Sequence, residues 1–330
     1  MTDQSFITND GVVRHRDIFS SLFLRCHGLN PVRTAVCWPC SPVALAGALE
    51  PHATGLIDPI LVGPSRTLRR IAATENLNLG SYRIVEATSE EEAACKSTDL
   101  CRTGQTQALM KGSLHTDVLM HSVLQRVGGL RTSKRISHVF VMEAPLYDRP
   151  LFITDAAVNI YPSLLEKAGI IQNVIDLAHV LGVTTPKVAI LSAVEIVCAN
   201  ITSTIDAAAL CKMADRGQIR GALVDGPLAF DTAVSMEAAR VKQLHSPVAG
   251  QADVLVVPDL ESGNMLAKQL EYLGGARLAG IVLGAKVPII LTSRADSSEA
   301  RMASCAIASL LIEANKRTRL SEPLCSQSSC

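Results

Sequence analysis

Short apolar runs alternate with helix-like segments along nearly the whole chain, and this alternation restricts the folds open to it. The strand candidates are residues 32–37, 57–62, 82–85, 107–110, 138–142, 151–154, 187–191, 221–224, 252–257, 278–283 and 288–291. Helical patterns fill most of the gaps, for example residues 41–50, 90–102, 115–125, 162–181, 204–216 and 263–273. The alternation predicts βαβ units, and therefore an α/β fold with mostly parallel sheets flanked by helices.

The composition supports a buried parallel sheet and excludes several classes of function. Hydrophobic residues make up 48% of the 330 residues and aromatic residues only 3%, so the core is built from aliphatic side chains. The formal net charge is zero, which gives no global attraction to nucleic acid or to a membrane. We find no apolar run that could span a bilayer and no signal-peptide pattern, and we read the ten cysteines as reduced thiols. We therefore expect a cytoplasmic protein without nucleic-acid or membrane partners.

A domain break is expected near residues 130–150. Two glycines at 128–129 precede the basic run 131–135, and residues 144–150 have the composition of a turn. The strands on either side of that turn, 136–142 and 151–154, are predicted to pair antiparallel at an edge of an otherwise parallel sheet.

Ser293 and Arg294 lie at a strand-to-helix turn, where ligands bind in open α/β sheets. The apolar run 287–291 precedes them, and a helix with one apolar face follows. The amide groups at the start of that helix favour an anion, and the planar Arg294 fork can bind phosphate or carboxylate bidentately. Alternatively, Arg294 is an ordinary surface arginine, and the Ser293 hydroxyl caps backbone N–H groups at the start of the helix.

Lys111, Ser113 and His115 follow another predicted strand, 107–110. Gly112 between them permits close approach of the backbone to a ligand. Lys111 can neutralise phosphate, and His115 can accept a proton near neutral pH. Alternatively, Ser113 caps the next helix and His115 lies in its first turn.

Further polar candidates follow the strands of the middle of the chain. Asp155, Asn159, Asp225 and Asn264 are candidates for substrate binding, whereas Asp231 is expected to be an N-cap. No histidine cluster accompanies the carboxylates, so we expect no metal site. Neither a phosphate-binding loop of the Walker type nor a dinucleotide fingerprint is present in the sequence.

Several segments resemble the phosphate acetyl/butyryltransferases, also called phosphotransacetylases, and they occur in that family's order. The segments are 109–117 (LMKGSLHTD), 152–159 (FITDAAVN), 224–231 (VDGPLAFD), 257–264 (VPDLESGN) and 292–297 (TSRADS). The similarity is closest to the subgroup that is often fused behind an enoyl-CoA hydratase domain, for which this chain has no room.

The resemblance implies a fold, a reaction and a set of partners. The fold has two α/β domains of the isocitrate dehydrogenase type, here residues 1–136 with 301–330 and residues 137–300, with an active-site cleft between them. The reaction is the reversible transfer of an acetyl or other short acyl group between CoA and inorganic phosphate, giving acetyl phosphate. CoA and phosphate are substrates, no further cofactor is expected, and we expect a homodimer.

The resemblance also assigns roles. The family uses a Ser–Arg pair at this place, so Ser293 and Arg294 are predicted to be catalytic, together with Lys111, which would assist in orienting phosphate. Ser113, His115, Asp155, Asn159, Asp225 and Asn264 are the predicted substrate-binding residues. The basic run 131–135 either meets the CoA phosphates or is a solvated loop.

The residue that acts as general base toward the CoA thiol is not identified by the sequence. Many family members carry an acid about seven positions after the serine, where this chain has Ala300. The neighbouring Glu299 stands three residues after Asp296, which is the spacing of a capping box. We therefore expect Glu299 to cap the helix rather than to accept the proton.

Three other functions remain open at this point. Phosphate butyryltransferases share these motifs, so the acyl chain length is not fixed by them. A metal- and NAD-dependent decarboxylating dehydrogenase shares the fold type, but its signature is not visible. A non-catalytic acyl-CoA sensor would explain the missing acid at Ala300.

Arg294 offers the first test. Replacing Arg294 by Ala should cut turnover strongly, and Arg294→Lys should restore it only in part, because lysine lacks the bidentate fork. Steady-state kinetics at varied phosphate measure both effects. Near-normal kinetics of Arg294→Ala with unchanged phosphate dependence would remove Arg294 from the site.

Overall fold

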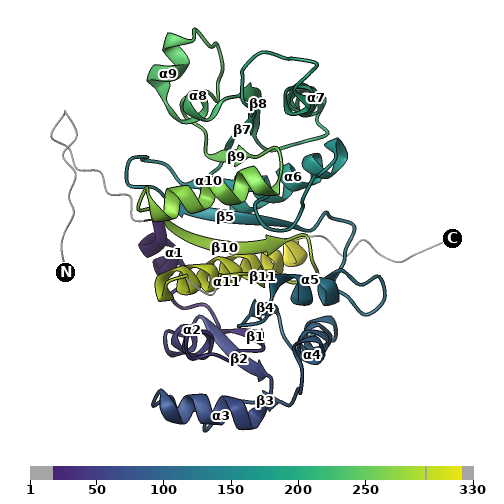
Figure 1. The fold of residues 1–330 in the computed structure, drawn as a ribbon, viewed down its shortest axis with the longest axis vertical. Helices are drawn as coiled ribbons and strands as arrows, with labels where there is room; N and C mark the ends of the chain where they lie inside the picture. Colours follow the sequence, from purple (N-terminus) through teal and green to yellow (C-terminus); the bar gives the residue numbers. More distant parts are fainter. Residues whose placement is uncertain (1–17, 294–295, 322–330) are drawn as a thin grey trace.

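The structure, a computed structural model, describes residues 18–293 and 296–321, with side chains described as far as residue 317. The described residues form eleven strands in one sheet that runs along the long axis of the molecule (Figure 1). The strands are β1 Val32–Cys37, β2 Ile57–Val62, β3 Ile84–Val85, β4 Ala108–Lys111, β5 Ser137–Glu143, β6 Leu151–Thr154, β7 Lys187–Leu191, β8 Leu223–Leu228, β9 Val254–Val256, β10 Arg277–Leu283 and β11 Ile289–Ile290.

Helices connect most of these strands. They are α1 Ile18–Cys26, α2 Pro42–Ala53, α3 Ser65–Thr74, α4 Glu90–Arg102, α5 Thr116–Leu124, α6 Leu164–Val180, α7 Thr202–Asp215, α8 Phe230–Val234, α9 Met236–Val241, α10 Leu260–Tyr272 and α11 Ser298–Ser321. The predicted α/β class with a mostly parallel, helix-flanked sheet is confirmed. Among the described residues, no helix has both the length and the apolar character needed to cross a membrane.

The strand order is β3-β2-β1-β4-β11-β10-β5-β6-β9-β7-β8. The first five strands pair parallel, and so do the last four, from β6 to β8. Each half therefore has its own carboxyl edge, at which side chains from different strands can meet.

The antiparallel pairs lie in the middle of the sheet and join its two halves. β10 pairs antiparallel with both β11 and β5, and β5 pairs antiparallel with β6. The expected pairing of β5 with β6 is therefore correct, but its expected place at a sheet edge is wrong. A run such as Val139 to Val141 of β5 is equally apolar at the edge or in the centre of a sheet, so composition alone did not distinguish the two positions.

The two-domain division at residues 136 and 300 stays a prediction. In the sheet order, β11 pairs with β4 and so joins the half that contains β1 to β4, although its residues precede position 300. Helix α11 also contacts this half, because it packs on α1, α2 and β11 as well as on β10 (Figure 1).

His138 is a titratable group inside the central antiparallel pair. It lies on β5, has no exposed surface, and packs edge-to-face against Phe140 with ring centroids 4.4 Å apart. Among the described residues, neither ring nitrogen has a hydrogen-bond partner. Burial lowers the pKa of His138 to about 3, because the charged imidazolium cannot be solvated there.

This burial predicts a loss of stability in mild acid. The pKa of His138 is lower in the folded than in the unfolded chain, so its contribution is intact above about pH 6.5 and declines as the pH falls toward 3. At pH 5 the cost should be on the order of 2 kcal/mol of unfolding free energy. Urea unfolding at pH 7.5 and 5.0 should show that decrease in the wild type and much less of it in His138→Leu. The exposed His27→Gln serves as control, and an equal decrease in all three proteins would contradict the prediction.

Candidate active site

A polar pocket lies at the carboxyl ends of two neighbouring parallel strands, β4 and β11. β4 ends at Lys111, and β11 is followed by Thr292 and Ser293. We call it the β4–β11 pocket, and its lining residues are Ser41, Val43, Ala44, Met110, Lys111, Gly112, Ser113, Thr292, Ser293 and Arg301. The structure thus brings together Lys111, Ser113 and Ser293, which the sequence placed after two different strands.

Gly112 brings the chain after β4 against the chain after β1. Its N–H donates to the Cys37 carbonyl at 2.8 Å, and a Cβ at this position would lie 2.4 Å from that oxygen and 2.5 Å from the Trp38 oxygen. Glycine is therefore required here by the approach of two backbone segments, and the close approach to a ligand that the sequence suggested stays a prediction.

Ser113 fixes this contact and does not cap helix α5. Its hydroxyl donates to the Trp38 carbonyl at 2.9 Å and accepts from the Cys40 N–H at 3.2 Å. The chain that Ser113 holds in this way leads directly into Ser41 and α2. The position of the α2 N-terminus thus depends on Ser113.

The N-terminus of α2 supplies the positive end of a helix dipole at the pocket. Ser41 caps the helix, since its Oγ accepts from the Ala44 N–H at 3.2 Å, and Pro42 occupies the first turn. Ser41, Val43 and Ala44 all line the pocket. Amide groups and the dipole at a helix start favour a bound anion.

Two cationic side chains reach the same pocket. Lys111 and Arg301 are each only 6% exposed, whereas Val43 and Ser293 are exposed and mark the opening. Hydroxyls of Ser113, Thr292 and Ser293 add hydrogen-bonding groups. Buried positive charge beside a helix N-terminus gives this pocket the chemistry of an anion site. Arg294, the predicted partner of Ser293, lies outside the described residues.

A tight turn holds the segment that carries Ser293. The Asp296 Oδ2 accepts from the Ser293 N–H at 2.7 Å, and the Asp296 N–H donates to the Ser293 carbonyl at 3.3 Å. The other oxygen, Oδ1, lies 3.8 Å from the Lys268 Nζ on α10. Asp296 therefore orients the backbone at Ser293, while its Oδ1 lies near Lys268 of α10 without a hydrogen-bond partner among the described residues.

The expected capping box of Asp296 and Glu299 is wrong. The cap of α11 is Ser297, whose Oγ accepts from the Ala300 N–H at 3.1 Å. Glu299 instead forms an ion pair with Arg277, with Nη1 and Oε1 2.6 Å apart. The spacing suggested a cap, but the helix begins one residue later and Ser297 takes that role. Ala300, at the position of the family's acid, is buried.

Asp155 lies in a buried turn directly after β6. One carboxylate oxygen accepts from the N–H groups of Ala157 and Val158, each at 2.9 Å, and the other accepts from the His138 N–H at 3.1 Å and from Asn159. Burial raises the pKa of Asp155, while these hydrogen bonds act in the opposite direction.

Asn159 and Asn264 belong to the same region. Asn159 donates to the Ile136 carbonyl at 2.9 Å and accepts from the Arg135 Nε at 2.7 Å. Asn264, on α10, donates to the Ala156 carbonyl at 3.3 Å. The structure thus groups Asp155, Asn159 and Asn264 around the turn after β6, and their substrate-binding roles stay predictions.

The remaining predicted residues lie apart from the pocket lining. His115 is exposed at the N-cap of α5, two residues after Ser113. Asp225 lies within β8, the strand at the far edge of the sheet, and its Oδ1 accepts from the Gly226 N–H at 2.8 Å. Asp231 is not an N-cap, because α8 begins after Ala229, and it pairs with Lys242 at 3.0 Å.

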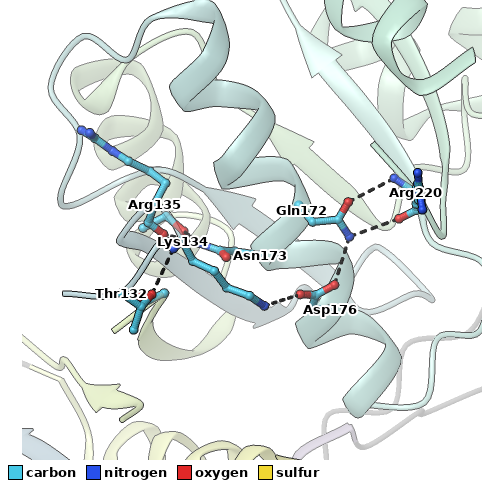
Figure 2. A network of polar contacts seen from close by, with 9 residues as sticks. Thr132, Lys134, Arg135, Gln172, Asn173, Asp176 and Arg220 are labelled. Carbon is cyan, nitrogen blue, oxygen red and sulfur yellow. Dashed lines mark hydrogen bonds and ion pairs between the residues drawn. The ribbon is translucent and has the colours of Figure 1, made fainter. Parts of the chain in front are cut away.

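The basic run 131–135 is tied to α6 (Figure 2). The Lys134 Nζ lies 2.9 Å from the Asp176 Oδ2, and the Asn173 side chain donates to the Arg135 carbonyl at 2.6 Å. Thr132 accepts from the Lys134 N–H at 3.0 Å. The run is therefore a loop fixed by polar contacts with α6. A role toward the CoA phosphates stays a prediction.

Two parts of the pocket were missed from the sequence. Ser41 followed by Pro42 is a standard helix-start signal and would have placed a positive helix end near the ligand. Arg301 gives no sequence signal, because an arginine one turn into a helix is usually exposed. Within the described residues, no group of three or more His, Cys, Asp or Glu side chains is arranged to hold a metal ion.

The strand order and the β4–β11 pocket define an α/β protein with a buried cationic pocket at the end of parallel strands. The family model described as "Phosphate acetyl/butaryl transferase" matches residues 87–309. A phosphate acetyltransferase of Rhizobium meliloti is 58% identical over 280 residues, which cover 85% of this chain and 89% of the relative. The chain belongs to the phosphate acetyl/butyryl transferase family and is an acyltransferase.

Two further relatives agree with this assignment. A phosphate butyryltransferase of Clostridium acetobutylicum is 40% identical over 293 residues, covering 89% of this chain and 97% of the relative. The crystal structure of a branched-chain phosphotransacylase from Enterococcus faecalis has a TM-score of 0.73 at 30% identity, covering 85% of this chain and 99% of that one. The α/β architecture, with two parallel halves joined by central antiparallel strands, is therefore that of the phosphotransacylases.

The corrected cap of α11 gives a prediction with an internal comparison. Ser297→Ala should lower the unfolding free energy by about 1 kcal/mol, because it removes the acceptor for the Ala300 N–H. Glu299→Gln should cost less than about 1 kcal/mol, because its ion pair with Arg277 is partly exposed. Chemical denaturation measures both values.

Glu299→Gln also tests the identity of the general base. Glu299→Gln should retain most of its turnover and its pH profile, since the carboxylate is engaged by Arg277. A hundredfold loss of turnover at an unchanged melting temperature would instead identify Glu299 as the proton acceptor.

Proposed function

We propose that this protein catalyses the reversible transfer of an acetyl group between CoA and inorganic phosphate. The observation that carries the proposal is the β4–β11 pocket, in which Lys111 and Arg301 lie beside the N-terminus of α2, in a chain of the phosphate acyltransferase family. Phosphate is the kind of anion that these buried cations and helix-start amide groups attract.

The reaction needs positioning and charge neutralisation. A phosphate oxygen attacks the thioester carbonyl carbon, the C–O bond forms, and the C–S bond then breaks to release CoA as thiolate. The proton of hydrogen phosphate ends on the CoA sulfur, so acetyl phosphate and CoA thiol are the products. Lys111 and Arg294 would orient the phosphate, and Ser293 would hydrogen-bond the carbonyl oxygen or the sulfur as charge develops there. Holding both substrates together supplies the entropic part of catalysis.

Acetyl is the acyl group we favour. The acetyltransferase of Rhizobium meliloti is 58% identical, whereas the butyryltransferase of Clostridium acetobutylicum is 40% identical. Butyryl transfer is the alternative within the same chemistry, since the groups that line the β4–β11 pocket suit phosphate and do not distinguish acyl chains of different length.

Further parts of the proposal rest on the family resemblance and on composition. We expect the reaction to proceed without a metal or another cofactor, in the cytoplasm, with a homodimer as the working form. Asp155, Asn159, Asp225, Asn264, Ser113 and His115 keep their proposed roles in binding CoA or phosphate. A non-catalytic sensor of acyl-CoA, suggested by the buried Ala300, would bind these ligands without turnover.

A CoA-release assay tests the proposal directly. With phosphate present and EDTA added, the purified protein should release CoA from acetyl-CoA faster than from propionyl- or butyryl-CoA. Acyl phosphate should form in equal amount, detected as the hydroxamate. Replacing phosphate by chloride is the control for simple hydrolysis. A protein that binds acetyl-CoA without releasing CoA would support the sensor, and activity restored only by magnesium or manganese would contradict the metal-free mechanism.

A further inference from the structure

Arg301 is a charged residue that α11 buries in the β4–β11 pocket. It lies near the start of α11, is only 6% exposed, and lines the pocket together with Lys111, Ser113 and Ser293. Its neighbour Ala300 stands where many relatives were expected to carry an acid. Ala300 itself does not line the pocket but packs in the core of the other half, so of these two neighbours only Arg301 faces the pocket.

Gly47 on α2 makes room for the Arg301 side chain. A Cβ at Gly47 would lie 2.4 Å from the Arg301 Cδ, 3.0 Å from its Nε and 3.6 Å from its Cζ. The end of the side chain thus runs directly past the backbone of α2, and any larger residue at 47 would displace it. Glycine in the middle of a helix is unfavourable by roughly 1 kcal/mol relative to alanine. Gly47 therefore lowers the stability of α2 but leaves space for the Arg301 side chain.

The charge around Arg301 points to an anionic ligand. Lys111 is equally buried, and both cations lie beside the amide groups at the start of α2. Electrostatic attraction between a charged group and its ligand is strong where water is excluded, and a guanidinium can donate two parallel hydrogen bonds to one phosphate.

We propose that Arg301 binds the phosphate substrate and that Gly47 keeps its side chain in the pocket. This assignment rests on the proposed acyl transfer to phosphate and extends it to two residues outside the recognised sequence segments. Arg301 of α11 would act with Lys111 of β4 in neutralising the anion. Phosphate affinity would also depend on Gly47 of α2, which leaves space for the Arg301 side chain.

A purely structural role for Arg301 gives different expectations. α2 and α11 also contact each other through Glu50, which accepts a hydrogen bond from the Ser298 hydroxyl, and through Thr54 Oγ1 with the Met302 sulfur at 3.9 Å. If Arg301 only joins the two helices, its replacement lowers stability and leaves the KM for phosphate unchanged.

The test compares Arg301→Gln and Arg301→Lys with the wild type and with Arg317→Gln, an exposed arginine of the same helix. We expect Arg301→Gln to raise the KM for phosphate at least about tenfold, since it removes charged hydrogen bonds. The KM for acetyl-CoA should change less than about twofold, with an intermediate phosphate KM for Arg301→Lys. Arg317→Gln should behave as the wild type. A lower melting temperature with an unchanged phosphate KM would overturn the assignment.

Gly47→Ala is the second, independent variant. It should raise the phosphate KM by displacing Arg301, and it should have no further effect on that KM when Arg301 is already replaced by Ala. A full additive effect of Gly47→Ala in that background would contradict the coupling.

Calorimetric titration of inorganic phosphate into the same variants separates this inference from the proposed reaction. Weaker phosphate binding by Arg301→Gln supports the assignment even if the wild type shows no CoA release, which would refute only the proposed function. Active wild type with equal phosphate binding by wild type and Arg301→Gln would refute only the assignment of Arg301.

Discussion

The parallel pairing of β4 between β1 and β11 is the constraint on which the site depends. It brings together the ends of three segments: the chain after Cys37, the chain after Lys111, and the chain at Thr292. The contact closes only because Gly112 has no side chain and because Ser113 bonds to the backbone of Trp38 and Cys40. From this point α2 starts, so one register of three strands determines where the helix dipole, Lys111 and Ser293 meet.

Burial of positive charge is the cost of this arrangement. Lys111 and Arg301 lose most of their contact with water, which is unfavourable unless opposite charge or hydrogen bonds compensate. A site of this kind is organised before its ligand arrives, because the groups that will face the anion are already oriented by strands and helices. Asp296 extends the organisation by holding the Ser293 backbone and by lying near Lys268 of the other half.

Much of the fold followed from the sequence, because buried parallel strands are continuous aliphatic runs. β1, β2, β6 and β7 begin and end at the predicted residues, and α4 does as well. The central position of β5 and β10 did not follow, since apolar composition does not report strand direction. Lys111, Ser113 and Ser293 were found because they come directly after strands, whereas Arg301 reaches the pocket only through tertiary packing. The Asp296 spacing misled the prediction for Glu299, because a helix start shifted by one residue changes which side chain caps it.

The packing of α11 has a consequence for how the protein is made. The Ser309 hydroxyl donates to the Leu56 carbonyl and the Cys26 thiol to the Ala306 carbonyl, contacts that span 253 and 280 residues of sequence. Such distant contacts close late and slow folding. During synthesis, β1 and β2 emerge from the ribosome long before α11, so one face of their core stays uncovered until α11 has been made. A chain that terminates before α11 would therefore expose apolar core surface and would lack Arg301. We expect such truncated chains to be recognised by chaperones and proteases and not to bind substrate.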